Sequence, residues 1–318
     1  MPTLINTRLK LPANYQRDNF FAFHQRDAQM LSEMVKDNQL VKGICWNELP
    51  ARLTLTFKKQ QLTTELHIDS GRRKLNEAHI EQELRHLVKH MLGLNQAIHE
   101  FESFIQEHPH LGPLVAKQSG LRVPQSASAF EALSWAITGQ QISVHAAISL
   151  RRNLIRYAGV QHSSGIYCCP GPTQLVAFTV DELRAQGFSL TKAQTILELA
   201  RLIHSGELPL ETWLRDYWNN TLLPLPAQDI HDRLIQVKGV GPWTISYALL
   251  RGFGWLDGSL HGDVAVRRNL QWLLAVDKQL NNEEKISEAA TKEWLAGFSP
   301  WRALVAAHLW AMQKADGY

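Results

Sequence analysis

The hydrophobic and polar positions of the first hundred residues change their period along the chain. Strict alternation over 51–57 is typical of a half-buried strand, and 61–69 follows after a polar turn, so the two segments predict an antiparallel hairpin. Apolar residues at helical spacing then predict a helix over 77–92, and a further short helix is expected over 19–35. Residues 1–104 are therefore predicted to form an α+β domain with an antiparallel sheet.

From about residue 105 onward, the pattern becomes helical. Apolar positions recur three and four residues apart, as they do on one face of a helix. They predict a helix over 131–145 that Gly139 interrupts, a second that continues through Ile155, and others over 190–200, 284–296 and 301–314. The fold class is thus expected to be mainly α, with an N-terminal α+β domain.

The composition is that of an ordinary globular chain, long enough for two or three domains. Hydrophobic residues make up 45% of the 318 residues and charged residues 20%, which argues against intrinsic disorder. The formal net charge of +3 is compatible with a nucleic-acid partner but does not require one. The 3 cysteines, of which Cys168 and Cys169 are adjacent, make neither a disulfide framework nor a Cys-X-X-Cys motif.

Signals for export or membrane insertion are weak. No run approaches the roughly 18 apolar residues of a membrane-spanning helix, and the N-terminus lacks the apolar core of a signal peptide. The cysteine usage suits a reducing compartment. We therefore expect a cytoplasmic protein with no membrane partner, and a monomer.

The stretch 234–247 carries the most specific local signal. An apolar run is followed by Gly239 and Gly241, and Pro242 opens a second apolar run. Glycine permits a tight reversal and proline suits the first turn of a helix, so the stretch predicts two helices joined by a short hairpin. Backbone N–H groups at the start of the second helix would form an anion-binding site. Asp263 precedes the next apolar run, where an aspartate is most often a helix N-cap.

The segments 237–244 and 263–268 together resemble the helix-hairpin-helix superfamily of DNA base-excision glycosylases. Lys238 stands where that family often has a proline. Members that also cleave the DNA strand carry a nucleophilic lysine directly after the hairpin, where this chain has Trp243. The resemblance therefore implies hydrolysis without lyase activity. No cysteine follows Cys169, which implies that there is no iron–sulfur cluster.

Within this superfamily, the chain is most similar to the alkylation-repair branch, the bacterial DNA-3-methyladenine glycosylase II type. The stretches that support this are 121–124 with 130–131, 139–144, 190–193, and 300–302 with 308–310. The similarity runs from about residue 105 to the C-terminus, and the N-terminal α+β region also fits. It implies three domains with an active cleft between the two helical ones: residues 1–104, residues 128–255, and residues 105–127 with 256–318.

The resemblance also implies a reaction. Enzymes of this branch release alkylated purine bases that are flipped out of duplex DNA, as the first step of base excision repair. A purine alkylated at a ring nitrogen is cationic and leaves readily, so hydrolysis needs an anion against the oxocarbenium-like sugar rather than a general acid. The resemblance assigns this catalytic role to Asp263. Stacking of the electron-poor base is implied for Trp243, Tyr247, Trp310 and Phe23.

DNA contacts and one ion are implied as well. The DNA-binding residues are expected to be Lys238, Gly239, Val240, Gly241, Thr244, Arg267 and Arg268. Gln141 occupies the position of the residue that fills the gap left by the flipped base, where relatives often have an apolar side chain. The backbone carbonyls of Ile235, Val237 and Val240 are expected to hold a monovalent cation, with no other cofactor.

Two other functions stay open at this stage. One is a glycosylase for deaminated, oxidised or etheno bases, because the sequence does not rank such lesions. The other is a non-catalytic DNA-binding module, since helix-hairpin-helix elements also serve purely as phosphate contacts. Each aromatic residue has a plainer interpretation as a core side chain, and Arg267 and Arg268 have one as solvated surface residues.

Overall fold

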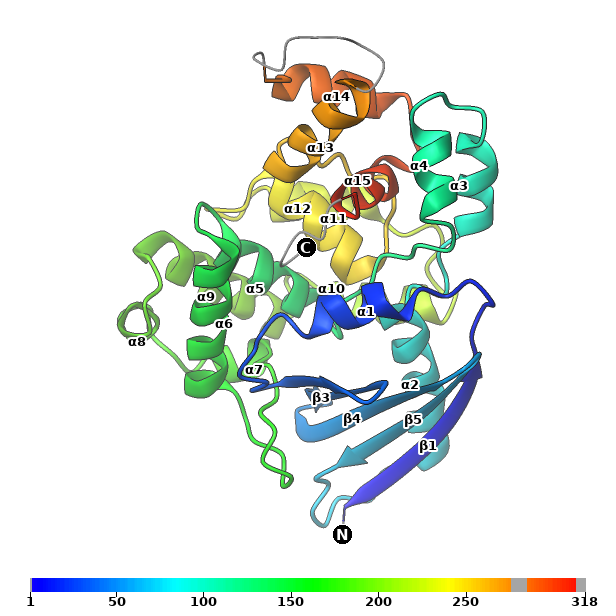
Figure 1. Ribbon diagram of the computed structural model, residues 1–318. Helices are drawn as coiled ribbons and strands as arrows, with labels where there is room; N and C mark the ends of the chain where they lie inside the picture. The colour runs from blue at the N-terminus through cyan, green and yellow to red at the C-terminus, as the bar shows by residue number, and fades with distance from the viewer. Residues whose placement is uncertain (1, 276–284, 313–318) are drawn as a thin grey trace.

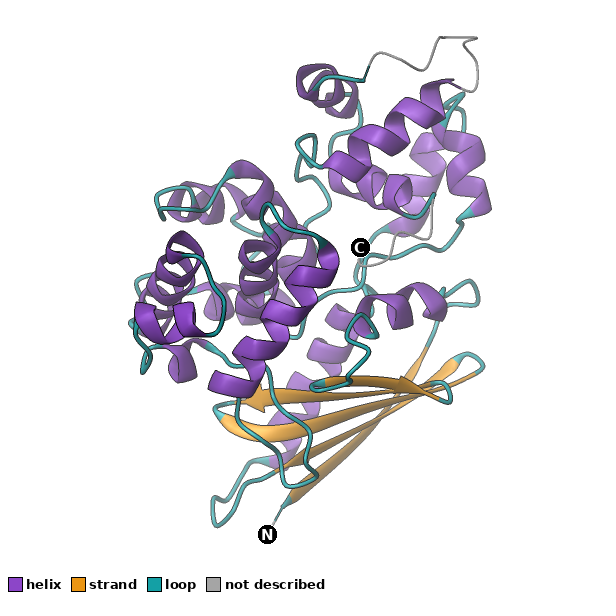
Figure 2. Cartoon of the chain, turned by 60° about the vertical axis from the view of Figure 1, so that its left-hand side comes forward, coloured by secondary structure: helices purple, strands orange, loops and turns teal. Residues whose placement is uncertain are grey.

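The computed structural model describes residues 2–275 and 285–312. Its N-terminal part is a five-stranded antiparallel sheet with the order β1-β5-β4-β3-β2. Figures 1 and 2 show the sheet at the end of the molecule that holds the N-terminus, with α1 (Arg17–His24) between the sheet and the helical parts. The strands are β1 (Thr3–Lys10), β2 (Glu33–Lys36), β3 (Gln39–Trp46), β4 (Leu49–Lys58) and β5 (Gln61–Ile68).

The predicted hairpin and the helix that follows it are confirmed. Strands β4 and β5 pair in antiparallel register, and every second residue of β4 over 51–57 is buried, as a strand with one face on the core requires. Helix α2 (Glu77–Met91) begins after Asn76, whose side chain accepts the N–H of His79. It packs against β1 and completes the N-terminal core.

The predicted helix over 19–35 is wrong beyond its first turns. Helix α1 ends at His24, and the chain turns before it enters β2. The Asp27 carboxylate accepts the N–H of Gln29 and forms an ion pair with Arg152 at 2.6 Å. That arginine lies 125 residues further along the chain, so local periodicity could not reveal the contact that stabilises the turn.

The rest of the described chain is helical, and its buried apolar side chains form two further clusters. The turn that follows Gly139 separates two of the helices at the predicted interruption. No described helix is long and apolar enough to span a membrane. One group comprises α5 (Ala129–Gly139), α6 (Val144–Ala158), α7 (Pro172–Leu175), α8 (Val180–Ala185), α9 (Leu190–His204), α10 (Leu210–Trp218), α11 (Ala227–Leu234), α12 (Pro242–Ala248) and the π-helical turn η1 (Leu249–Phe253).

The second group comprises α3 (Ile98–Ile105), α4 (Leu111–Lys117), α13 (Val264–Ala275), α14 (Glu288–Ala296) and α15 (Arg302–Trp310). Figure 2 shows the two groups side by side above the sheet. Helix α12 lies between them, because Ile245 belongs to the core of the first group and Tyr247 to that of the second. Of the predicted C-terminal helices, residues 284, 313 and 314 lie outside the described residues.

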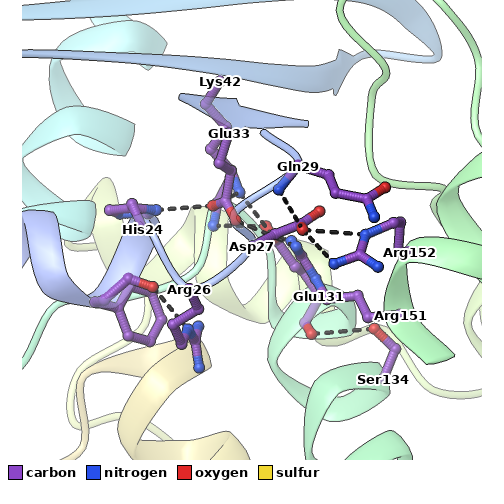
Figure 3. Close-up of polar contacts among 12 residues, drawn as sticks. His24, Arg26, Asp27, Gln29, Glu33, Lys42, Glu131, Ser134, Arg151 and Arg152 are labelled. Atoms are coloured by element: carbon purple, nitrogen blue, oxygen red, sulfur yellow. Dashed lines mark hydrogen bonds and ion pairs between the residues drawn. The ribbon is translucent and has the colours of Figure 1, made fainter. Parts of the chain in front are cut away.

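A buried network of charges joins the sheet to α5 and α6 (Figure 3). Lys42 of β3 lies 2.6 Å from Glu33 Oε1 and 2.7 Å from Glu131 Oε1. Arg151 of α6 contacts the same two carboxylates at 3.2 and 2.9 Å, and His24 Nδ1 lies 2.8 Å from Glu33. Burial raises the pKa of Glu33, but Lys42 and Arg151 outweigh burial and hold that pKa well below its usual range. The sheet is therefore fixed to α5 and α6 by paired charges.

Candidate active site

Side chains from other parts of the fold hold the hairpin between α11 and α12. Gly239 adopts φ 90, and a Cβ there would overlap Thr195 Oγ1 of α9, so the turn requires glycine. The Thr195 hydroxyl donates to the carbonyl of Lys238 at 2.8 Å. Gln140 donates through Nε2 to the carbonyl of Gly239 and to the buried Thr244 Oγ1, both at 3.0 Å. The hairpin is thus fixed against the turn between α5 and α6, and the Thr244 side chain serves that attachment.

The backbone groups of Val237 and Val240, both predicted as site residues, form a hydrogen bond with each other. The N–H of Val240 donates to the carbonyl of Val237 at 3.0 Å, which closes the turn. The Val240 N–H is thereby occupied, which leaves the N–H groups of Gly239 and Gly241 for the predicted phosphate contact. Gly241 is the N-cap residue of α12. Lys238 is exposed beside them. The hairpin consequently presents a helix N-terminus and a cation together.

Asp263 is buried at the start of α13, between two indole rings. Its Oδ1 accepts the backbone N–H groups of Ala265 and Val266 at 2.9 and 3.0 Å, as a helix cap does. Trp310 Nε1 donates to the same oxygen, and Trp243 Nε1 donates to Oδ2, each at 3.1 Å. Only 4% of the residue is exposed. The capping role and the candidate catalytic role therefore coexist in one carboxylate, which four N–H donors surround.

A cleft of about 1040 Å³ opens beside this carboxylate. Trp243 and Tyr247 line it and stack on each other, with ring centroids 5.2 Å apart and 28° between the ring planes. The ring centroid of Trp310 lies 6.4 Å from that of Tyr247, but Trp310 is buried and does not line the cleft. Of the predicted pocket aromatics, two thus form a wall, while Trp310 holds Asp263.

Phe23, the fourth predicted pocket aromatic, is buried in α1 and packs against two guanidinium groups. Those of Arg26 and Arg251 lie 4.2 and 4.6 Å from its ring centroid. Arg26 also lies 4.4 Å from the ring of Trp135, which lines the cleft, and Arg251 lies 5.6 Å from that of Trp310. The structure therefore places Phe23 in a layer that supports the cleft-lining side chains, and not among them.

The sequence interpretation missed the two arginines and the tryptophan of this layer. Burial lowers the pKa of Arg251 to about 10, although Tyr247 opposes the shift. Arg251 also donates to the carbonyl of Pro124 at 2.8 Å. A basic residue inside the apolar run 249–253 is the signal that could have identified it, because a charge there must find partners in the interior. Trp135 carried no such signal, since it lies on an ordinary apolar helix.

Gln141 lies in the turn between α5 and α6, at the cleft. Its φ of 55 falls in the left-handed region that glycine adopts most readily. Ile142 beside it is 39% exposed, and Ser143 then caps α6. The predicted gap-filling position is thus an exposed pair of side chains, one polar and one apolar.

The two predicted arginines follow Asp263 on α13, and neither lines the cleft. Arg267 is partly buried on α13, and the exposed guanidinium of Arg268 lies 5.3 Å from the Trp272 ring. Ser259, His261 and Glu288 are among the cleft-lining side chains that were not predicted as site residues.

One group of described side chains has ligand atoms close enough together for a metal ion: His67, Asp69 and His162. The N–H of Ser164 donates to His162 Nδ1 at 3.0 Å, so the neutral ring carries its proton on Nε2. That nitrogen lies 2.7 Å from His67 Nδ1, and the N–H and hydroxyl of Ser163 donate to Asp69. Hydrogen bonds between β5 and the segment after α6 therefore explain this group without a metal.

Family comparison agrees with the hairpin and the cleft. The model of the HhH-GPD superfamily of base excision DNA repair proteins matches residues 134–296, just over half of the chain. The chain belongs to this superfamily. The model of the AlkA N-terminal domain matches residues 6–128, which covers most of the sheet and helices α1 to α4.

Curated relatives and solved structures extend the similarity of this HhH-GPD protein. A DNA-3-methyladenine glycosylase of Bacillus subtilis (strain 168) is 24% identical over 93% of this chain and 96% of its own. DNA-3-methyladenine glycosylase 2 of Escherichia coli (strain K12) is 27% identical over 63% of each chain. The 3-methyladenine DNA-glycosylase from Archaeoglobus fulgidus has the same fold, with a TM-score of 0.77, 21% identity, and coverage of 96% of this chain and 98% of that one.

Proposed function

We propose that this protein is a DNA-3-methyladenine glycosylase, which hydrolyses the N-glycosidic bond of alkylated bases in duplex DNA and leaves an abasic site. The observation that carries the proposal is Asp263, held by the indoles of Trp243 and Trp310 beside an aromatic cleft. The HhH-GPD family and the names of the B. subtilis and E. coli relatives support the same activity.

The cleft suits a base that has left the duplex. The stacked rings of Trp243 and Tyr247 offer a π surface to a cationic purine. Gln141 and Ile142 stand where a side chain can occupy the space that the base vacates. As the glycosidic bond breaks, its electron pair leaves with the cationic base, and the carboxylate of Asp263 stabilises the positive charge of the sugar.

Strand cleavage is not part of the proposal. A lyase forms a Schiff base between an amine and C1′ of the sugar. No lysine is among the residues of the described chain that line the cleft, and the position directly after the hairpin is Trp243. The product is therefore an abasic site in an intact strand.

The hairpin is proposed to hold the DNA backbone. Gly239 and Gly241 offer N–H groups to a phosphate, and Lys238 adds a positive charge. The carbonyls of Ile235, Val237 and Val240 are proposed to share a monovalent cation, with the Val237 carbonyl also accepting the N–H of Val240. Such an ion would offset part of the phosphate charge at the turn.

The test compares wild type with Asp263→Asn on duplex DNA that carries N-methylated purines. Asparagine keeps the shape and its oxygen can still accept hydrogen bonds, but the anion is lost. Base release should fall by about 100- to 1000-fold while duplex binding persists. Equal excision by the variant would refute the catalytic assignment. Binding without base release by either protein would favour a non-catalytic DNA-binding module.

A further inference from the structure

Asp263 has little capacity left for proton transfer. A carboxylate offers about four lone-pair positions, and four N–H donors already contact this one: Ala265, Val266, Trp310 and Trp243. The proposed function uses the remaining charge against the oxocarbenium-like sugar. If Asp263 also took the proton of the attacking water, it would lose that charge during the same reaction. A separate proton acceptor for the water is therefore expected in the cleft.

Three side chains next to Asp263 form a suitable arrangement. His261 Nδ1 lies 2.8 Å from Ser259 Oγ, which fixes the ring when Nδ1–H donates to the hydroxyl oxygen. Its Nε2 then carries a lone pair and lies 3.6 Å from Glu288 Oε1. All three residues line the cleft with Asp263, and a Cβ on Gly262 would lie 3.4 Å from Glu288 Oε1. The carboxylate of Glu288 thus lies against the backbone just before Asp263.

The separation between His261 and Glu288 fits one shared water. A distance of 3.6 Å is too long for a direct hydrogen bond, but both atoms are acceptors within reach of the same water molecule. A water that donates both protons to them keeps its oxygen lone pairs free for attack. Glu288 is otherwise unexpected in a cleft that receives DNA, because a carboxylate repels phosphate.

Burial, more than any neighbouring charge, favours the neutral form of the His261 ring. Burial lowers the pKa of His261, Glu288 opposes the shift, and the positive charges of Lys292 and Arg302 add to it. With 19% of its side chain exposed, the ring still reaches solvent. A neutral imidazole in this place can accept a proton and pass it on to water.

We propose that His261 and Glu288 hold the water that attacks C1′, with His261 Nε2 as its proton acceptor and Ser259 as a positioning residue for the ring. The proposal rests on the proposed glycosylase function. The C1′–N bond breaks with its electron pair on the departing base, and the water oxygen forms the new bond to C1′. The proton moves to His261 Nε2 and then to solvent past Glu288.

The experiment measures single-turnover release of 7-methylguanine from a defined duplex between pH 5 and 9. Wild-type activity should fall as the pH drops through the pKa of His261, because a protonated ring cannot accept a proton. His261→Gln should be slower by on the order of 100-fold at pH 8 and should lose this acid limb. His99→Gln, on a ring with 81% of its side chain exposed on α3, should match wild type.

Glu288→Gln gives a second, directional test on a residue with 60% of its side chain exposed. Glu288 raises the pKa of His261, so its removal should move the acid limb to lower pH. Binding of both variants to a duplex with an abasic site should stay within about twofold of wild type, since neither is expected to supply much binding energy.

The outcomes separate the two proposals. If His261→Gln excises 7-methylguanine at the wild-type rate and with the wild-type pH profile, the water-binding role is refuted while the glycosylase function stands. A uniform loss at all pH values with weaker duplex binding would also refute it, because that pattern indicates a structural role. Absence of base release by wild type at every pH, both from the 7-methylguanine duplex and from duplex DNA that carries other N-methylated purines, would instead refute the glycosylase function.

Discussion

The ammonium of Lys42 lies 2.7 Å from the carboxylate of Glu131, and both groups are buried where the sheet meets α5. Lys42→Met removes the ammonium that pairs with both Glu33 and Glu131. The two buried carboxylates then share the guanidinium of Arg151. We expect a loss of about 3–5 kcal/mol in the free energy of unfolding, measured by urea denaturation. Arg201→Met removes an exposed ion pair with Glu198 and should change the stability little. Equal effects of the two substitutions would contradict the prediction.

Trp243→Phe tests the bond between the cleft wall and the carboxylate. Phenylalanine retains a ring against Tyr247 but removes the N–H that donates to Asp263 Oδ2. A lost hydrogen bond to a charged group should slow excision by about 10- to 100-fold in single-turnover assays. Trp294→Phe, in the core around Phe298, should retain the wild-type rate. If Trp243→Phe excised as fast as this control, the indole N–H would be dispensable.

Gln141→Gly separates backbone strain from the filling of the DNA gap. Because φ is 55 at this position, glycine should leave the stability unchanged or slightly higher. It removes the side chain, so the equilibrium for base flipping should fall by about 10-fold. The fluorescence of 2-aminopurine placed next to the lesion measures this equilibrium. Asn220→Gly, with φ 56 outside the cleft, is the matched backbone control. If flipping were unchanged, Ile142 rather than Gln141 would be the residue that fills the gap left by the flipped base.

Two buried histidines should make the protein sensitive to mild acid. Burial lowers the pKa of His90 and of His308 to about 3 each, whereas an unfolded histidine titrates near 6.5. Because the folded pKa is the lower one, this stability is complete above pH 6.5 and is lost as the pH falls towards 3. Near pH 5, the free energy of unfolding should fall by about 2.7 kcal/mol per pH unit from the two rings together.

Urea denaturation at several pH values between 7 and 5 measures that slope. His308→Asn should lower the slope by about 1.4 kcal/mol per pH unit, whatever the variant does to stability at pH 7, because one proton fewer is taken up on unfolding. The lowered pKa values of Glu33 and Glu131 act below this window and do not contribute to it. A slope that is the same in the variant would contradict the assignment.

Local sequence patterns predicted those elements whose structure depends mainly on neighbouring residues in the sequence. Strands β4 and β5 alternate regularly, and α2 has a continuous apolar stripe, so both followed from periodicity. Strand β2 is short and polar, and β3 contains Gly43, whose backbone lies so close to Tyr167 that a Cβ would overlap the Tyr167 carbonyl. Both depend on distant partners, as does the turn at Asp27. The boundaries of the three domains stay a prediction.

The candidate site divides in the same way. The hairpin, Asp263 and Trp243 lie in two short segments, and the resemblance of these segments to the glycosylase superfamily implied that they act together. Their geometry supports this, because the Trp243 indole contacts the carboxylate directly. The layer of Phe23, Arg26 and Arg251 brings together segments from opposite ends of the chain, and no local spacing encodes such a contact. Single residues in it were therefore assigned to the cleft wall or missed.

The layer around Phe23 bears on how separable the N-terminal domain is. Phe23 contacts Arg251, whose guanidinium faces Trp310, and Trp310 holds Asp263. A chain shortened to begin at α3 would lack Phe23 and would expose the buried guanidinium of Arg251 to water. The N-terminal domain, through α1, is thus better regarded as an integral part of the catalytic unit than as an appended module. A fragment without it should hold Trp310 and Asp263 less rigidly.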